Sequence, residues 1–285
     1  MILSFHPCFD ADIQIILGSR SLNKEDNQLI SSADAIILPQ AAPENLYQAS
    51  LKSGAYIFPD YAMRLKYPGK IGQNQMFAFY NLPKPRLFVW KNVQSFKNRF
   101  PELKESPFPY PFFIKDNLSH EGNGVFYVSD RPSLLQALEK MIIQEESHFD
   151  GFITQESISS YGNVLRVVII GEKIISYWKR PEFDGQTITT ISRGAIIDRK
   201  WMPELKEKGE LYSVILSKKT GINLAAIDFV FPLEDKDPEP LFLEINYYFG
   251  RRGLGGSIEY YKLLYGAIQA WVTLIGLNPK KIKLI

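Results

Sequence analysis

Short apolar runs alternate with polar segments over residues 1–60, and this alternation predicts the first elements of the chain. Four apolar runs predict strands, because each is short and bounded by polar or turn-forming residues. The runs are MILSF, DIQIILG, DAIILPQ and GAYIFPD, and the predicted helices beside them are NKEDNQLISS and PENLYQASLKS. Strands interleaved with helices favour a small parallel α/β domain.

The pattern changes after residue 60. Residues 61–110 are dense in proline and aromatic residues, which indicates a linker with one helix around GQNQMFAFYN. Longer strands follow from residue 111, with two helices among them, RPSLLQALEKMIIQE and MPELKEKGELYSVILSKKTG. The predicted strands are PFFIKD, GVFYVS, GFITQESI, VLRVVII, KIISYWKR, AAIDFVF and LFLEIN. Antiparallel hairpins rather than βαβ units make the predicted fold class α+β.

The last two strands form a hairpin that carries polar side chains on one face. Glu244 and Asn246 project from the same side of LFLEIN, and Asp228 lies in AAIDFVF. If the hairpin is symmetric about Lys236, Asp228 lies directly across from Glu244, with Cβ atoms about 4.5–5.5 Å apart. Two such carboxylates repel each other, so one pKa should rise unless a cation lies between them.

Two interpretations of this hairpin remain open. Three hard oxygen ligands with open coordination positions suit Mg²⁺, which keeps waters and accepts phosphate oxygens. Alternatively, Asp228 and Glu244 are solvent-facing charges on an amphipathic hairpin. The neighbours on the same face, Ala226, Val230 and Phe242, are apolar and favour the metal site.

A second hairpin, VLRVVIIGEKIISYWKR, is predicted to turn at Gly171-Glu172, where glycine in the first position suits a type II′ turn. Arg166 then faces Tyr177 and shares a side with Lys179. A guanidinium on an apolar strand face favours binding of a carboxylate or phosphate. The alternative is an arginine stacked on its aromatic neighbours.

A glycine-containing loop joins the strand that carries Lys115 to the next strand, in FFIKDNLSHEGNGVFYV. Gly122 and Gly124 would let the backbone approach phosphates closely, with N–H groups that hold anions. The alternative is an ordinary hairpin turn.

Composition narrows the class of protein. The chain has 285 residues, 45% of them hydrophobic, enough for two domains, and its net charge of +2 implies no nucleic-acid partner. The single cysteine, Cys8, favours a reducing compartment, and the start MILSFHPCFDAD does not resemble a signal peptide. The run LLYGAIQAWVTLIGL is shorter than the roughly 20 residues of a membrane span, so it predicts a buried C-terminal helix. We therefore expect a cytoplasmic protein with no membrane partner.

Taken in order, the motifs resemble the ATP-grasp superfamily, in its glutathione-synthetase-like and glutamate-ligase-like branches. The motifs are YPGKIGQNQ, FFIKDN, SHEGNGV, FITQESI, LRVVIIGEKIISYWKRP, ISRGA, AIDFVF and FLEINYYFG. The resemblance implies two α+β lobes that grip ATP, preceded by a small parallel α/β pre-grasp domain. The expected divisions are 1–60 for the pre-grasp domain, 61–150 for the linker and N-terminal lobe, and 151–285 for the C-terminal lobe with the magnesium hairpin.

The resemblance also implies a role for each motif. One lysine in each of the first two motifs would hold the nucleotide phosphates, and SHEGNGV would form a mobile lid over them. The backbone of FITQESI would bind adenine. Arginines would lie near the transferred phosphate and the substrate carboxylate. The implied residues are Lys70 and Lys115 for phosphates; His120, Gly122 and Gly124 for the lid; Gln155, Glu156 and Ile158 for adenine; Asp228, Glu244 and Asn246 for the metal; and Arg166, Arg193 and Lys179 for catalysis.

The implied activity is ATP-dependent ligation with Mg²⁺, or Mn²⁺ in its place. A substrate carboxylate would become an acyl-phosphate that an amine or thiol attacks, with small molecules or peptides as substrates. The alternatives are a small-molecule kinase on the same fold and a nucleotide-binding protein without turnover; a homodimer is also left open. Arg251 and Arg252 suggest a second acidic group on the substrate, or are solvated loop charges.

Overall fold

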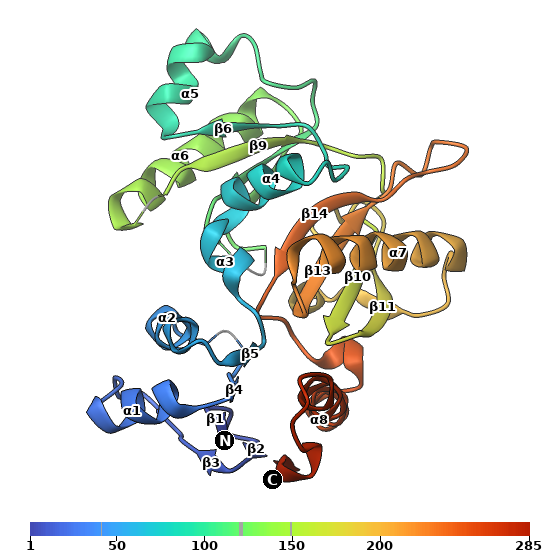
Figure 1. Cartoon of the computed structure of the whole chain (residues 1–285). Coiled ribbons are helices and arrows are strands. Elements are labelled where there is room, and N and C mark those ends of the chain that lie inside the picture. The colour runs from blue at the N-terminus through green and yellow to red at the C-terminus, as the bar shows by residue number, and fades with distance from the viewer. Residues whose placement is uncertain (41, 120–121, 149) are drawn as a thin grey trace.

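The computed structural model describes residues 1–40, 42–119, 122–148 and 150–285. The chain starts with a parallel four-stranded sheet in the order β3-β1-β4-β5, which confirms the predicted parallel α/β unit. Alternate strand residues face the two sides of this sheet, so helices α1 and α2 cover one side and α8 the other (Figure 1). The elements are β1 (Ile2–Ser4), β3 (Ile13–Gln14), α1 (Lys24–Ser32), β4 (Ala35–Ile37), α2 (Glu44–Ser53), β5 (Tyr56–Phe58) and α8 (Ser257–Leu274).

A second four-stranded sheet, antiparallel and in the order β6-β9-β7-β8, forms the upper lobe in Figure 1. Helices α5 and α6 pack on it around a core that is rich in phenylalanine. Strand β9 lies beyond residue 150 and still belongs to this sheet, and the domain divisions stay a prediction. The elements are β6 (Leu87–Trp90), α5 (Val93–Arg99), β7 (Phe112–Asp116), β8 (Val125–Val128), α6 (Arg131–His148) and β9 (Phe152–Glu156).

The interpretation of residues 61–110 as a linker with one helix is wrong. The expected helix is α4 (Gly69–Phe79), but the segment also contains α3 (Ala62–Lys66), α5 and β6. β6 is a short edge strand with β9 as its partner, and its exposed Phe88 and Val89 gave no alternating pattern. Phe96, Phe100 and Phe108 of this segment are buried in the lobe core, and Tyr61 and Phe77 are buried in the core beside the other two sheets, so much of the aromatic density reflects burial rather than an extended linker.

The third sheet is antiparallel, in the order β12-β11-β10-β13-β14, and α7 and α8 cover its opposite faces. The predicted hairpin turns at Gly171 and Glu172, with a φ of +61° at Gly171, and Arg166 lies opposite Tyr177 as expected. The predicted C-terminal helix is α8, which packs between this sheet and the parallel one. The elements are β10 (Val164–Ile170), β11 (Lys173–Arg180), β12 (Ile196–Asp198), α7 (Pro203–Thr220), β13 (Leu224–Val230) and β14 (Leu241–Asn246).

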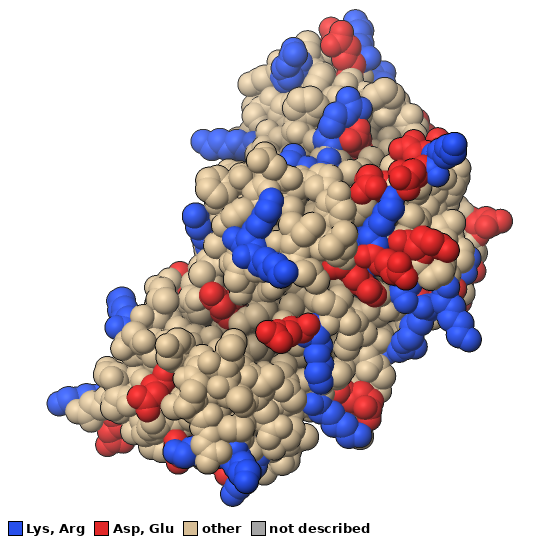
Figure 2. All heavy atoms as spheres, turned by 45° about the vertical axis from the view of Figure 1, so that its right-hand side comes forward, with Lys and Arg blue, Asp and Glu red and all other residues tan. Residues whose placement is uncertain are grey.

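Short elements complete the described chain, and the two ends meet because β15 pairs with β2. Within the described ranges, no helix is long and apolar enough to cross a membrane. On the face in Figure 2, acidic and basic side chains are interspersed rather than gathered by sign. The short elements are β2 (Phe9–Asp10), η1 (Pro101–Leu103), η2 (Ile191–Arg193), η3 (Arg252–Leu254), η4 (Pro279–Lys281) and β15 (Lys283–Leu284).

Candidate active site

A row of polar side chains crosses four strands of the third sheet. Tyr177, Arg166, Asp228 and Glu244 are direct cross-strand partners in that order. The predicted pairing of Asp228 with Glu244 is therefore confirmed. The register shifts by one residue beyond Asp228, so the symmetry about Lys236 does not continue into the loop.

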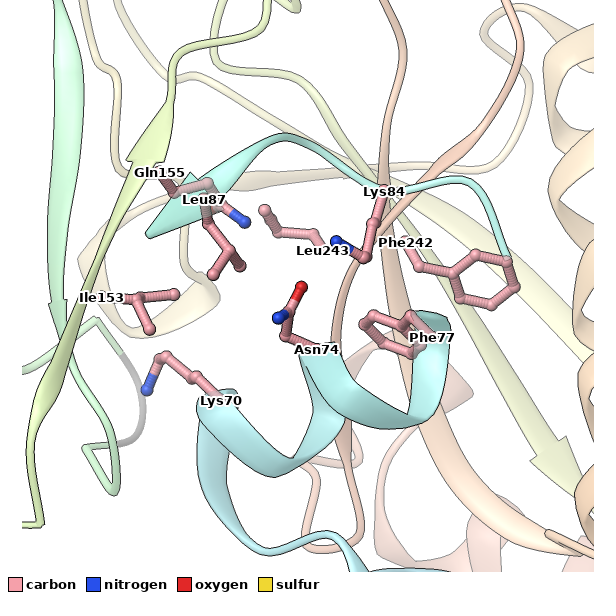
Figure 3. A pocket seen from close by; sticks show the side chains of 9 residues that line it. All are labelled: Lys70, Asn74, Phe77, Lys84, Leu87, Ile153, Gln155, Phe242 and Leu243. Carbon is pink, nitrogen blue, oxygen red and sulfur yellow. The ribbon is translucent and has the colours of Figure 1, made fainter. Parts of the chain in front are cut away.

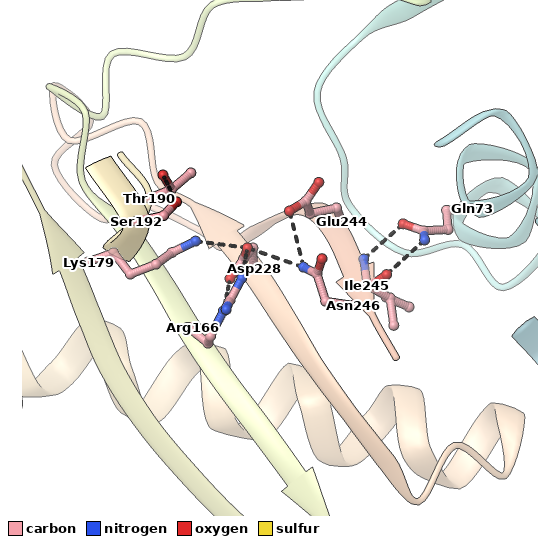
Figure 4. A network of polar contacts seen from close by, with 9 residues as sticks. All are labelled: Gln73, Arg166, Lys179, Thr190, Ser192, Asp228, Glu244, Ile245 and Asn246. Atoms are coloured by element: carbon pink, nitrogen blue, oxygen red, sulfur yellow. Dashed lines mark hydrogen bonds and ion pairs between the residues drawn. The ribbon is translucent and has the colours of Figure 1, made fainter. Parts of the chain in front are cut away.

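Asp228 is a buried anion held by two cations (Figure 4). The Arg166 guanidinium donates through Nε to Oδ1 at 2.8 Å and through a second nitrogen to Oδ2 at 2.7 Å, and Lys179 Nζ lies 2.9 Å from Oδ2. Only 1% of Asp228 is exposed, so it is not a solvent-facing charge. Burial alone would raise the pKa of Asp228, but the charges of Arg166 and Lys179 lower it well below its usual range.

Glu244 and Asn246 complete this face. Asn246 Nδ2 donates to Glu244 Oε1 at 3.1 Å and to Asp228 Oδ2 at 3.4 Å. Among the described residues, no three His, Cys, Asp or Glu side chains gather as a metal site, so a cation here needs the Asn246 amide oxygen as its third ligand. Half a turn of that amide would present the oxygen instead of the nitrogen. The oxygen donors available on this face then fit Mg²⁺.

Two lysines of the other lobe lie near this face, Lys115 buried and Lys70 half-buried. Lys70, at the start of α4, donates from Nζ to the Ser119 carbonyl at 2.6 Å, and Lys115 Nζ lies 2.5 Å from Gln155 Oε1. Burial lowers the pKa of both lysines, that of Lys115 to about 8, although Glu244 acts in the opposite direction. Within the described part of the chain, neither ammonium has a carboxylate within 4.0 Å.

A narrow cleft separates the lobes (Figure 3). Its walls are mixed, and polar groups from α4, β9 and the segment before β6 reach in among apolar side chains. The backbone of this segment bridges the two sheets, since Phe242 N–H donates to Pro83 and Glu156 N–H donates to Arg86. The lining residues are Lys70, Asn74, Phe77, Lys84, Leu87, Ile153, Gln155, Phe242 and Leu243.

The remaining predicted residues lie around this centre. Glu156 is paired with Arg86 at 2.6 Å, and the Ile158 carbonyl accepts from Ser160 N–H. The arginine of η2, Arg193, donates to the Gly122 carbonyl at 3.0 Å, so the glycine loop contacts the C-terminal lobe. Gly122 and Gly124 have positive φ, +76° and +63°. His120 lies outside the described residues.

Two residues that the sequence interpretation missed hold α4 in place. Asn117 accepts from Lys70 N–H through its carbonyl at 3.0 Å and from Ile71 N–H through Oδ1 at 2.9 Å, and so caps the helix. A Cβ on Gly69 would lie 2.4 Å from that Oδ1, which requires glycine. Gln73 bonds to β14. The signal in the sequence that could have found them is their spacing from the two predicted lysines. Asn117 follows Lys115 by two residues, and Gln73 follows Lys70 by three.

Comparison with solved structures shows the fold of the protein. The structure resembles the VanG D-Ala:D-Ser ligase from Enterococcus faecalis, with a TM-score of 0.58 and 17% identity over 84% of this chain and 73% of that one. It also resembles a RimK domain ATP-grasp protein from Sphaerobacter thermophilus, with a TM-score of 0.55 and 14% identity over 92% of this chain and 97% of that one. The fold is therefore the expected ATP-grasp fold.

The family follows from the sequence. Residues 70–259 match the RimK-like ATP-grasp domain, which is more than half of the chain, and the chain belongs to this family. Beta-citrylglutamate synthase B from Danio rerio is 26% identical over 55% of this chain and 36% of its own length. N-acetylaspartylglutamate synthase A from Homo sapiens is 24% identical over 55% of this chain and 38% of its own length. The matches thus span well under half the length of these curated relatives.

Proposed function

We propose that this protein is an ATP-dependent ligase that activates a carboxylate as an acyl-phosphate and joins it to an amine. The observation that carries the proposal is the arrangement across the cleft. Asp228, Glu244 and Asn246 offer oxygen ligands on one side, and Lys70 and Lys115 offer positive charge with no acidic partner, among the described residues, on the other. Family membership and the names of the curated relatives support the same chemistry.

The nucleotide would lie between the two antiparallel sheets. Its base would occupy the cleft beside Gln155, with Glu156 and Ile158 at the end of β9. A magnesium ion held by Asp228, Glu244 and Asn246 would neutralise phosphate charge, and Mn²⁺ suits the same oxygen ligands. The lid glycines, Gly122 and Gly124, would cover the phosphates.

The cationic side chains would then act mainly by position and charge. Lys70 and Lys115 bind phosphate oxygens, while Arg166 and Lys179 balance Asp228 and orient its carboxylate. Arg193, which already contacts the glycine loop, binds the transferred phosphoryl group. The γ-phosphoryl bond to ADP breaks as a bond to the substrate carboxylate forms; the amine then displaces phosphate and loses a proton. A closed lid protects the acyl-phosphate from water.

The acceptor site would include Arg251. Its guanidinium stacks over the rings of Tyr260 and Tyr261, at 4.7 and 4.6 Å, and has no acidic partner among the described residues. A half-buried guanidinium of this kind suits a substrate carboxylate. Both curated relatives are named for products that contain glutamate, so an amino acid is the proposed amine substrate.

The test is a screen of amino acids, peptides and small acids for phosphate release with Mg-ATP. Glu244→Gln should reduce turnover to below about one per cent of wild type, because a charged oxygen is lost beside the phosphates. Circular dichroism should show an unchanged fold. A Glu244→Gln variant that turns over at the wild-type rate would contradict the proposal. Phosphorylated product without free phosphate would indicate a kinase, and no turnover with any acceptor would indicate a binding protein.

A further inference from the structure

Strand β14 lies at the edge of its sheet and pairs with β13 on one side. The backbone groups on the outer side of an edge strand need other partners, most of all where the strand is covered. Ile245, at 3% exposure, is such a residue. Its outer N–H and C=O therefore cannot rely on bulk water.

Gln73 supplies both partners from helix α4. Ile245 N–H donates to Gln73 Oε1 at 2.8 Å, and Gln73 Nε2 donates to the Ile245 carbonyl at 2.8 Å. The side-chain amide thus reproduces the donor and acceptor that a further strand would offer (Figure 4). An amide side chain carries the donor and the acceptor side by side on one planar group.

The position of this contact gives it a functional meaning. Ile245 lies between Glu244 and Asn246, whose side chains project from the opposite face of the strand. Holding the Ile245 peptide therefore fixes the direction of both neighbours. Gln73 also lies one helical turn from Lys70, so the same helix reaches the metal face and the phosphate-binding face.

The start of α4 is held independently. Asn117 caps its first turn from the end of β7, the strand that carries Lys115. Further along, Phe77 packs on Phe242 of β14 with ring centroids 5.2 Å apart. Helix α4 is therefore anchored to both sheets.

We propose that Gln73 is a positioning residue that sets Glu244 and Asn246 for a divalent cation bound with the nucleotide. The inference rests on the proposed function, since it assigns a role within the same site. Residues that orient metal ligands without touching the metal commonly change affinity by roughly 10–100-fold. Gln73 acts in this way through the backbone of β14 rather than through a ligand side chain.

The test compares Gln73→Met with Gln75→Met. Methionine preserves length and helix propensity but removes both hydrogen bonds. Gln75 lies on the same helix and is exposed, which makes it a matched control. Free Mn²⁺ is measured by electron paramagnetic resonance while protein and ADP are titrated. Gln73→Met should bind Mn²⁺ with ADP roughly 10–100-fold more weakly than wild type, and Gln75→Met should match wild type.

A second readout separates positioning from loss of structure. ADP binding in the presence of EDTA should be equal in wild type and Gln73→Met. Glu244 and Asn246 contribute only to the part of ADP affinity that requires the metal ion. If Gln73→Met does not fold, Gln73→Glu takes its place: the carboxylate still accepts from Ile245 N–H but cannot donate to the carbonyl, and binding of Mn²⁺ should again weaken.

Two outcomes distinguish the proposals. A folded Gln73 variant that binds Mn²⁺ and ADP as tightly as wild type overturns the role of Gln73 and leaves the ligase proposal intact. A wild-type protein that binds no Mn²⁺ with ADP overturns the proposed function, and the role of Gln73 falls with it.

Discussion

The two sheets that face each other across the cleft hold their buried charges in opposite ways. On the C-terminal sheet, Asp228 is surrounded by cations from neighbouring strands, Arg166 and Lys179. On the N-terminal sheet and α4, Lys115 and Lys70 are held by neutral oxygens of Gln155 and Ser119. In the first arrangement each cation has an acidic partner, whereas the second keeps positive charge that has no acidic partner among the described residues.

This difference predicts that substitutions in the two sheets will affect stability and nucleotide affinity to different extents. A buried ion pair is costly to break, because removing one partner leaves an uncompensated buried charge. A buried lysine with neutral partners has a lowered pKa and gains most when an anion arrives. We therefore expect the Asp228 cluster to govern stability and the lysines to govern nucleotide affinity.

The largest expected effect is on stability at the Asp228 cluster. Asp228→Asn removes the shared anion and leaves Arg166 and Lys179 buried side by side, which should lower the free energy of unfolding by about 3–5 kcal/mol. Urea denaturation measures the change. Adding Lys179→Met to this variant should recover part of the loss, because one unpaired cation is removed. A simple sum of the two single losses would contradict coupling within the cluster.

Next comes nucleotide affinity on the lysine side. Lys115→Met removes a charged donor, and it should weaken ADP binding by roughly 10–100-fold, the range of a charge-assisted hydrogen bond. Calorimetric titration with ADP is the measurement. Loss of Lys115 should not destabilise the ligand-free protein, because a buried charge without an acidic partner disappears. A Lys115→Met variant that is less stable but binds ADP normally would show that Lys115 serves stability rather than nucleotide binding.

A smaller effect should appear with pH. The pKa of Lys115 falls to about 8 on folding, so the folded protein releases this proton before the unfolded chain does as pH rises. Stability of the ligand-free protein should therefore increase above pH 8, by at most about 1.4 kcal/mol per pH unit, and this gain is lost as pH falls through 8. ADP affinity should change in the opposite direction. Lys115→Met should reduce the pH dependence of both stability and ADP affinity. If both pH dependences are unchanged in this variant, a group other than Lys115 causes them.

The smallest effect is expected at an exposed ion pair. Lys262 and Glu259 lie 2.8 Å apart on α8 but are 60% and 53% exposed. Lys262→Met should therefore change the free energy of unfolding by no more than about 0.5 kcal/mol. Thermal unfolding of Lys262→Met and of Asp228→Asn, measured side by side, compares the two effects. A loss as large as that of Asp228→Asn would show that burial does not control the strength of these pairs.

Much of the fold could be predicted because its signals are local. The pairing of β10 with β11 follows from a short turn, that of β13 with β14 follows from alternating faces on either side of a polar loop, and Asp228 lies opposite Glu244 as expected. β6 was missed because an edge strand exposes both faces in part. The sequence also left the partner of Arg166 open. That partner lies on β13, which is not adjacent to β10 in the sequence, so the pairing depends on the strand order of the sheet.

The sequence alone determined which side chains share a strand face, because the two-residue period and the turn residues act within one hairpin. It also specified the ordered motifs of the ATP-grasp fold. The tertiary structure decided which charges meet: Arg166 with Asp228, and Gln73 with Ile245 across 172 positions of the chain. Such contacts depend on how whole lobes pack, and that packing is a sum over many weak interactions that no local pattern encodes.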